Sequence, residues 1–184
     1  MTQTLSQAAP AGLETVRAFV NTWDIESSAD AIATPAELAR WLQNAALLIG
    51  DAVTADDVEH AIAVREALRA AMSANHDASP VPAGAVAELS QAADRAELAL
   101  SMTPDAGLVA TPRASGVDGA LGALLVIVAG AMTDGTWRRL KVCVNDACQW
   151  GFYDLSRARS GKWCSMKVCG NRAKQQAWRT RARK

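Results

Sequence analysis

The sequence has few of the residues on which enzyme active sites depend. His60 and His76 are the only histidines among 184 residues, and neither lies next to a cysteine in the sequence. Glycine-rich phosphate-binding loops of the Walker or Rossmann type are also absent. Histidine-based acid–base catalysis and nucleotide-dependent catalysis are therefore not indicated, and we expect that the protein is not an enzyme.

The sequence also lacks the long hydrophobic run of a membrane protein. Its longest uncharged apolar run, residues 120–132, has 13 residues, whereas a spanning helix needs about 20. The first residues, "MTQTLSQAAPAGLETV", have neither the basic start nor the apolar stretch of a signal peptide. Hydrophobic residues make up 50% of the chain, which is enough for a sizeable core. We expect a cytoplasmic protein with no membrane partner.

The formal net charge is zero, but the charges are unevenly distributed. Residues 137–184 contain 13 basic and two acidic side chains, a net charge of +11, whereas residues 1–136 contain 6 basic and 17 acidic ones, a net charge of −11. Such asymmetry is typical of a basic module that binds a polyanion. The alternative is a tail that serves only solubility.

The acidic part has the spacing and start signals of helices. Apolar residues at helical spacing predict a first helix that holds Leu13, Val16 and Val20 and runs into "NTWD". A second helix is predicted from Thr34 as N-cap, followed by a proline and a capping-box glutamate, to Gly50. The further elements expected are a helix capped by Thr54 with Asp57, a helix over 82–97, a hairpin in "LALSMTPDAGLVATP" and a helix over 117–132 ended by Asp134-Gly135.

These patterns predict a mainly α fold with a small β-hairpin. Residues 1–135 would form a helical domain. Residues 136–184 would form a small module of the zinc-ribbon or knuckle-like treble type that ends in a helix.

The four cysteines form two matched pairs, with the spacing Cys143-x4-Cys148-x15-Cys164-x4-Cys169. Four thiolates from two tight turns are typical of a closed, structural Zn²⁺ site, so we expect one zinc ion per chain. Nearby lysines at 141, 162 and 167 would offset the negative charge of the four thiolates. Two disulfides, an iron–sulfur cluster and a redox dithiol are the alternatives, although redox dithiols usually have a two-residue gap.

The cysteine module has few apolar side chains, so a metal ion would supply much of its stability. Four of the six tryptophans lie there, and most should pack around the two turns, although one or two could stack on bases. In particular, we expect Trp178 to dock the last helix on the zinc module.

The basic residues after Cys169 fall on one face of a helix. At 100° per residue, the side chains of Arg172, Gln176, Arg179 and Arg183 form one stripe, and arginine and glutamine recognise base edges in a major groove. The alternative is a frayed helix that contacts phosphates alone. The loop between the cysteine pairs adds phosphate-binding candidates, namely Arg157, Arg159 and Lys162.

A small-molecule site is a further candidate. Asn21, Trp23 and Asp24 follow the first helix, where polar groups beside an aromatic ring could line a cleft. The alternative is that Asn21 and Asp24 cap and turn the chain.

The C-terminal pattern "WCSMKVCGNRAK", with "CQWGFYDLSR" before it, resembles the CGNR zinc finger. The N-terminal part resembles the ABATE domain, described as a stress-induced transcription regulator, in the segments "FVNTWD", "TPAELARWL" and "REALRAAM". The resemblance covers nearly the whole chain. It implies zinc binding by the four cysteines and DNA binding that involves Arg157, Arg172 and Lys174. It also implies that the helical domain senses a signal, such as a small molecule.

Two functions follow from these observations. The first is a bacterial transcription regulator, active in a stress response, whose finger binds DNA and whose helical domain binds a small-molecule effector or forms a homodimer. The alternative is a zinc-stabilised protein–protein interaction module without specific DNA binding.

Overall fold

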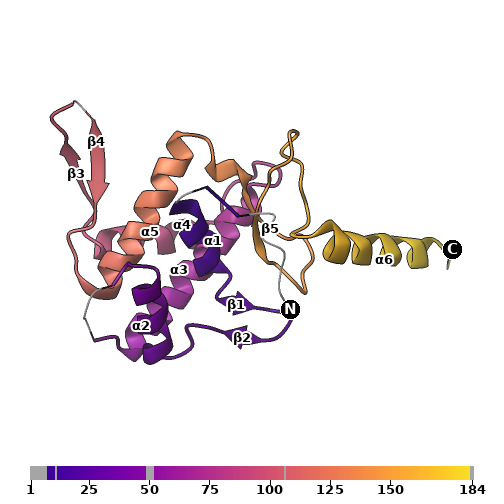
Figure 1. The fold of residues 1–184 in the computed structure, drawn as a ribbon, viewed down its shortest axis with the longest axis horizontal. Helices are drawn as coiled ribbons and strands as arrows, with labels where there is room; N and C mark the ends of the chain where they lie inside the picture. Colours follow the sequence, from indigo (N-terminus) through magenta and orange to yellow (C-terminus); the bar gives the residue numbers. More distant parts are fainter. Residues whose placement is uncertain (1–7, 11, 49–51, 106, 183–184) are drawn as a thin grey trace.

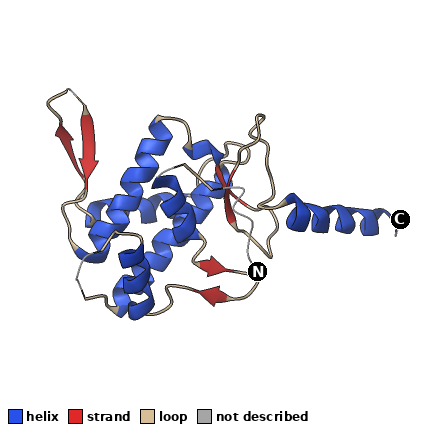
Figure 2. Ribbon diagram, in the orientation of Figure 1, coloured by secondary structure: helices blue, strands red, loops and turns tan. Residues whose placement is uncertain are grey.

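The computed structural model describes residues 8–10, 12–48, 52–105 and 107–182. Figure 1 shows a helical body from which two parts project at opposite ends, the β3–β4 hairpin and helix α6. The α-helices of the described residues are α1 (Gly12–Val20), α2 (Pro35–Asn44), α3 (Ala55–Ala74), α4 (Ala83–Arg95), α5 (Gly116–Thr133) and α6 (Asn171–Ala182). The mainly α fold is therefore confirmed, as the colours of Figure 2 make clear.

Within the described ranges, three small antiparallel ribbons accompany the helices. They are β1 (Trp23–Asp24) with β2 (Ala29–Asp30), β3 (Ala99–Met102) with β4 (Leu108–Thr111), and β5 (Leu140–Val142) with β6 (Gly151–Tyr153). A 3₁₀ turn, η1 (Trp137–Arg139), precedes β5, and a π-helical turn, η2 (Met166–Gly170), leads into α6. The β3–β4 ribbon is the hairpin that the sequence predicts.

Helix α3 runs through the centre of the body and contacts α1, α2, α4 and α5. Its Ala61, Val64, Leu68 and Met72 are fully buried, because apolar residues occur around most of its circumference. Helix α5 is apolar enough to cross a membrane by length and composition, with a mean hydropathy of 1.8. In the body it packs against α1, α3 and α4.

The helix start signals read from the sequence are confirmed. Thr34 accepts a hydrogen bond from the Glu37 amide, and Thr54 forms a complete capping box with Asp57. The predicted end of the second helix is wrong, because α2 stops at Asn44, and Gly50 lies outside the described residues. An alanine ends it instead: Ala46 adopts a left-handed backbone with φ of 56°.

Both histidines are packed against other groups of the protein. His60 is buried between Glu88 and Asp118, with each ring nitrogen 3.6 Å from a carboxylate oxygen. Burial, together with the nearby Arg95, lowers the pKa of His60. His76 lies with its Nε2 2.6 Å from the carbonyl oxygen of Val142, so it helps to hold strand β5.

The strands of the basic part join the core of the helical body. Trp137, Leu140, Val142 and Tyr153 are buried in the same hydrophobic cluster as α1, α3 and α5. Strand β5 packs on α3, and β6 contacts α1. The division at residue 135 stays a prediction, and the packing across it is extensive.

Candidate metal centre and basic surface

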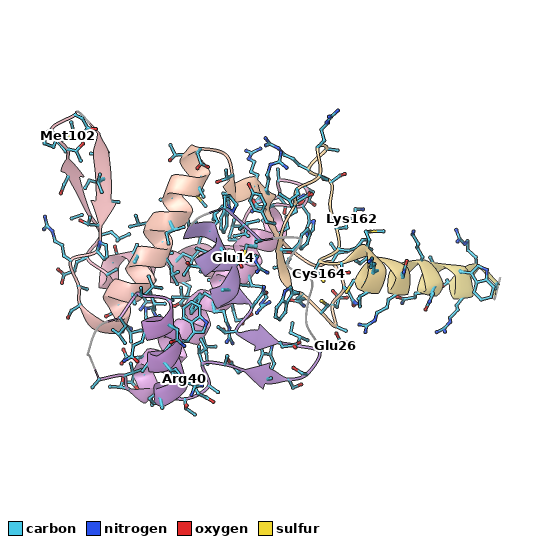
Figure 3. The ribbon with its side chains drawn as sticks, viewed as in Figure 1. Glu14, Glu26, Arg40, Met102, Lys162 and Cys164 are labelled. Atoms are coloured by element: carbon cyan, nitrogen blue, oxygen red, sulfur yellow. The ribbon has the colours of Figure 1, made fainter. Side chains whose placement is uncertain are left out.

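Four cysteine side chains converge at the junction between the helical body and α6. Cys143 directly follows β5, and Cys148 lies in the turn that returns to β6. Cys164 lies in a loop, and Cys169 lies in η2 immediately before α6. Their sulfur atoms all lie within 4.8 Å of one another, and Figure 3 places Cys164 at the base of α6.

The sulfur separations fit a single tetrahedral ion. Sγ of Cys164 lies 3.7 Å from Sγ of Cys148 and 3.8 Å from Sγ of Cys169. Four sulfurs bound to one Zn²⁺ at about 2.3 Å would be about 3.8 Å apart. A disulfide would bring two sulfurs to about 2.05 Å, and all four cysteines are free. The several irons of a cluster would hold the sulfurs farther apart, so the arrangement favours one soft divalent ion.

The titration behaviour of the thiols also calls for a cation. Hydrogen bonds from Cys148 and Cys164 lower the pKa of the Cys143 thiol. The neighbouring sulfurs in turn raise the pKa of Cys148 and, more strongly, that of Cys164. Because closely spaced thiolates repel one another, four of them need a bound cation to coexist.

Local sequence explains the shape of each turn. In the first turn, the Asn145 carbonyl accepts from the Cys148 amide at 2.8 Å, and the Asn145 side chain donates to Sγ of Cys169 at 3.8 Å. In the second turn, a Cβ atom on Gly170 would approach Sδ of Met166 to 2.8 Å. A larger residue directly after the last cysteine would therefore displace the end of the Met166 side chain.

The sequence suggested that Lys141 offsets the charge of the thiolates, but the side chain of Lys141 pairs with a carboxylate instead. Its side chain is 1% exposed and its Nζ lies 3.0 Å from Oδ2 of Asp154, which is 3% exposed. Nζ also donates to the carbonyl oxygen of Arg159. Asp154 accepts from the amides of Ser156 and Gly161 as well. This buried ion pair therefore organises the loop between the two cysteine pairs.

Two side chains of the helical body hold the first cysteine turn. The side-chain amide of Asn21 donates to the carbonyl oxygen of Gly151 at 3.0 Å, and its oxygen accepts from the backbone N–H of Gly151 at 2.7 Å. Arg69, buried on α3, donates to the carbonyl oxygens of Gln149 at 2.8 Å and Val20 at 2.6 Å. Sequence reasoning missed the role of Arg69, because its partners are sequence-distant backbone atoms.

The predicted small-molecule residues have local structural contacts. Asn21 binds Gly151, as described above, and the carboxylate of Asp24 accepts from the amides of Glu26 and Ser27 in the β1–β2 turn. Trp23 is partly buried in β1. A role for Asn21, Trp23 and Asp24 in binding a ligand stays a prediction.

A cleft of about 540 Å³ lies elsewhere, between the end of α3 and the first cysteine turn. On one side it is lined by Glu66, Ser73 and His76, and on the other by Val144 and Gln149. Sequence reasoning missed this cleft too, since its two walls are more than 60 residues apart in the chain.

The basic residues of the C-terminal part are exposed. Helix α6 projects from the body with no buried residue (Figure 1), so it presents Arg172, Lys174, Gln176 and Arg179 to solvent. Arg183 lies outside the described residues. The expected docking of α6 by Trp178 is wrong, since this side chain is 65% exposed. The tryptophans that pack against the cysteines are Trp150 and Trp163.

The loop between the cysteine pairs adds further exposed positive charge. Arg157, Arg159 and Lys162 are all exposed, and Lys162 lies beside the base of α6 in Figure 3. Arg172 has a partner in the helical body, because its guanidinium lies 2.8 Å from Oε1 of Glu26. This hydrogen bond raises the pKa of Arg172.

Comparison with known families agrees with this arrangement. Residues 14–135 match the model of the ABATE family, described as "Putative stress-induced transcription regulator", and residues 139–182 match the CGNR zinc finger. No curated protein gave a significant match. The first match covers well over half of the chain and the second covers the cysteine cluster with α6, so the chain belongs to the ABATE family and carries a CGNR zinc finger at its C-terminal end.

Proposed function

We propose that the protein is a cytoplasmic transcription regulator whose C-terminal module binds DNA. Helix α6 carries this proposal, because it is strongly basic, has no buried residue and projects from the body, with the pair between Arg172 and Glu26 at its first turn. Isolated helices of about 12 residues are marginal in water. A partner that stabilises α6 must complement its positive charge, and a nucleic acid is such a partner.

In this proposal, a structural Zn²⁺ ion is held by Cys143, Cys148, Cys164 and Cys169. The ion would supply charge neutralisation and a rigid junction, with all four coordination positions filled by sulfur. The cysteine turns fix where α6 starts, and the Lys141–Asp154 pair fixes the basic loop beside it. With every thiol engaged, no nucleophile remains among the cysteines, so the proposal includes no enzyme activity.

We assign different functions to residues 1–135 and residues 136–184. The family matches to residues 14–135 and 139–182 support this division. The helical domain would sense an effector and form the dimer, and the finger would bind DNA. Because Asn21 and Arg69 hold the first cysteine turn, a change in the helical domain could be passed to the finger.

DNA binding should depend steeply on salt, because exposed basic side chains of α6 and the loop would neutralise several phosphates. Each phosphate contact contributes about −0.9 to the slope of log affinity against log salt. Arg179→Ala should reduce the slope by about one and weaken binding several-fold, measured by fluorescence anisotropy with mixed genomic fragments. Arg40→Ala, an exposed arginine far from α6 (Figure 3), is the matched control and should change neither quantity.

A second variant should act in the opposite direction. Glu26→Gln removes the carboxylate that engages Arg172, so it should raise DNA affinity modestly. The contact between Glu26 and Arg172 is also the observation that favours the alternative, in which the basic module binds acidic protein surfaces. Negligible affinity of the wild-type chain for DNA at low salt would sink the DNA-binding proposal and favour this alternative.

We expect the effector to act at the cleft beside the first cysteine turn or near Asn21, Trp23 and Asp24. A metabolite panel screened by thermal shift should give at least one compound that raises the melting temperature of the full chain. Ser73→Trp should abolish that shift if the ligand occupies the cleft, and Asp24→Ala should abolish it if the ligand lies near β1. Absence of any stabilising compound would argue against an effector role.

A further inference from the structure

The β3–β4 hairpin projects at the end of the molecule opposite α6 (Figure 1). One of its faces is apolar and exposed to solvent. Its register pairs Leu100 with Ala110 and Met102 with Leu108, so these four side chains lie on one face. Leu100, Met102 and Leu108 are 67%, 71% and 62% exposed. Three large apolar side chains with this exposure on one face are unusual for a free surface.

One face of α5 continues this surface. Gly122 packs against the base of the hairpin, where an added Cβ would lie 3.0 Å from Cβ of Pro112. At 100° per residue, Val126, Ala129 and Gly130 follow Gly122 on the same face of the helix. Ala129 and Gly130 are exposed, and a Cβ on Gly130 would meet nothing within 4 Å. Small residues on this face of α5 leave room for the backbone of a partner chain to approach the helix closely.

The surface is nearly free of charge. Residues 98–112 contain one charged side chain, Asp105 in the turn, and residues 119–133 contain none, although 21% of the whole chain is charged. A nucleic acid or a charged protein surface would find no complement there. A partner that covers this surface must itself be apolar and uncharged.

We propose that the β3–β4 hairpin and the exposed face of α5 form the interface between two copies of this chain. A second copy offers the same uncharged apolar face, so the pairing is self-complementary. Neither strand carries the lysine or the mid-strand proline that usually protects an edge from pairing, and a lone two-stranded ribbon is marginal in water. Pairing at this end leaves both α6 helices uncovered.

This inference deepens the proposed function, because it locates the dimerisation assigned to the helical domain, but it does not require DNA binding. Multi-angle light scattering of the full chain, without DNA, should give twice the monomer mass of 19.4 kDa. The double variant Leu100→Lys/Leu108→Lys should give the monomer mass. The matched control Ser101→Lys/Thr111→Lys places the same charges on the opposite face of the hairpin and should remain dimeric.

Circular dichroism and the metal content of both variants identify any loss of fold. If the leucine variant misfolds, Gly130→Trp on α5 provides a second, independent way to block the face. A wild-type chain that stays monomeric at all concentrations overturns the proposal, as does a dimer that persists in the folded Leu100→Lys/Leu108→Lys or Gly130→Trp variant. Sedimentation of the monomer with uncharged lipid vesicles would assign the surface to a membrane instead. None of these outcomes bears on whether α6 binds DNA.

Discussion

Removal of the metal ion should unfold η2, α6 and the loop between the cysteine pairs, while α1 to α5 keep their structure. The reason is that few apolar contacts hold this segment, with Trp150 and Trp163 packed around the sulfurs themselves. Structural zinc supplies on the order of 10 kcal/mol of apparent binding free energy in comparable modules. Hydrogen exchange of the reduced chain, with and without chelator, should show lost protection in residues 154–182 and retained protection in α3.

Cys164→Ser should reproduce the effect of the chelator, since it removes one of four ligands and leaves the side-chain volume nearly unchanged. Strands β5 and β6 should lose less protection than α6, because Leu140, Val142 and Tyr153 are buried in the core of the helical body. Ser165→Ala, next to the ligand, is the matched control and should retain the metal. Equal protection of α6 with and without metal would contradict this prediction.

Breaking the buried pair between Lys141 and Asp154 should cost about 3–5 kcal/mol in the free energy of unfolding, because the remaining charge is left buried without its partner. Asp154→Ala leaves the Lys141 ammonium with the Arg159 carbonyl as its described acceptor. Urea unfolding of the metal-loaded protein measures the loss. The double variant Lys141→Met/Asp154→Ala should be less destabilised than the sum of the two single variants.

The same pair predicts a pH dependence. Burial alone would raise the pKa of Asp154, but hydrogen bonds from Ser156, Lys141 and the Gly161 amide hold it at about 2. A carboxylate with a depressed pKa stabilises the fold above its unfolded value of about 3.9, and this contribution, about 2 kcal/mol, is lost as pH falls toward 2. The stability difference between wild type and Asp154→Ala should therefore shrink as the pH falls. It should vanish no later than the pH at which acid releases the metal, because the loop that holds Ser156 and Gly161 unfolds with the metal site. A difference independent of pH would contradict this assignment.

Local rules of sequence were sufficient for much of the fold. The caps at Thr34 and Thr54, the hairpin around Pro104 and the end of α5 at Asp134 depend on residues within a few positions of each other. The cysteine cluster could also be anticipated, because matched spacings and the preference of zinc for thiolates restrict the options.

The remaining features depend on contacts between distant segments. The burial of Lys141 depends on Asp154, and the role of Arg69 depends on the carbonyls of Gln149 and Val20. Helical periodicity placed Trp178 on a different face from Arg172, but it could not tell whether any element would cover that face. The exposed position of Trp178 follows from the direction in which α6 leaves the cysteine cluster.

The central claim is that one divalent ion, bound by the four cysteines, holds the basic helix on the helical body. Native mass spectrometry of the reduced full-length chain, purified without added metal, tests it most directly. The account predicts a mass increment of one zinc ion per chain. Replacement of any one of the four cysteines by serine should abolish this increment. A metal-free chain whose α6 and connecting loop are nevertheless protected from hydrogen exchange would contradict it.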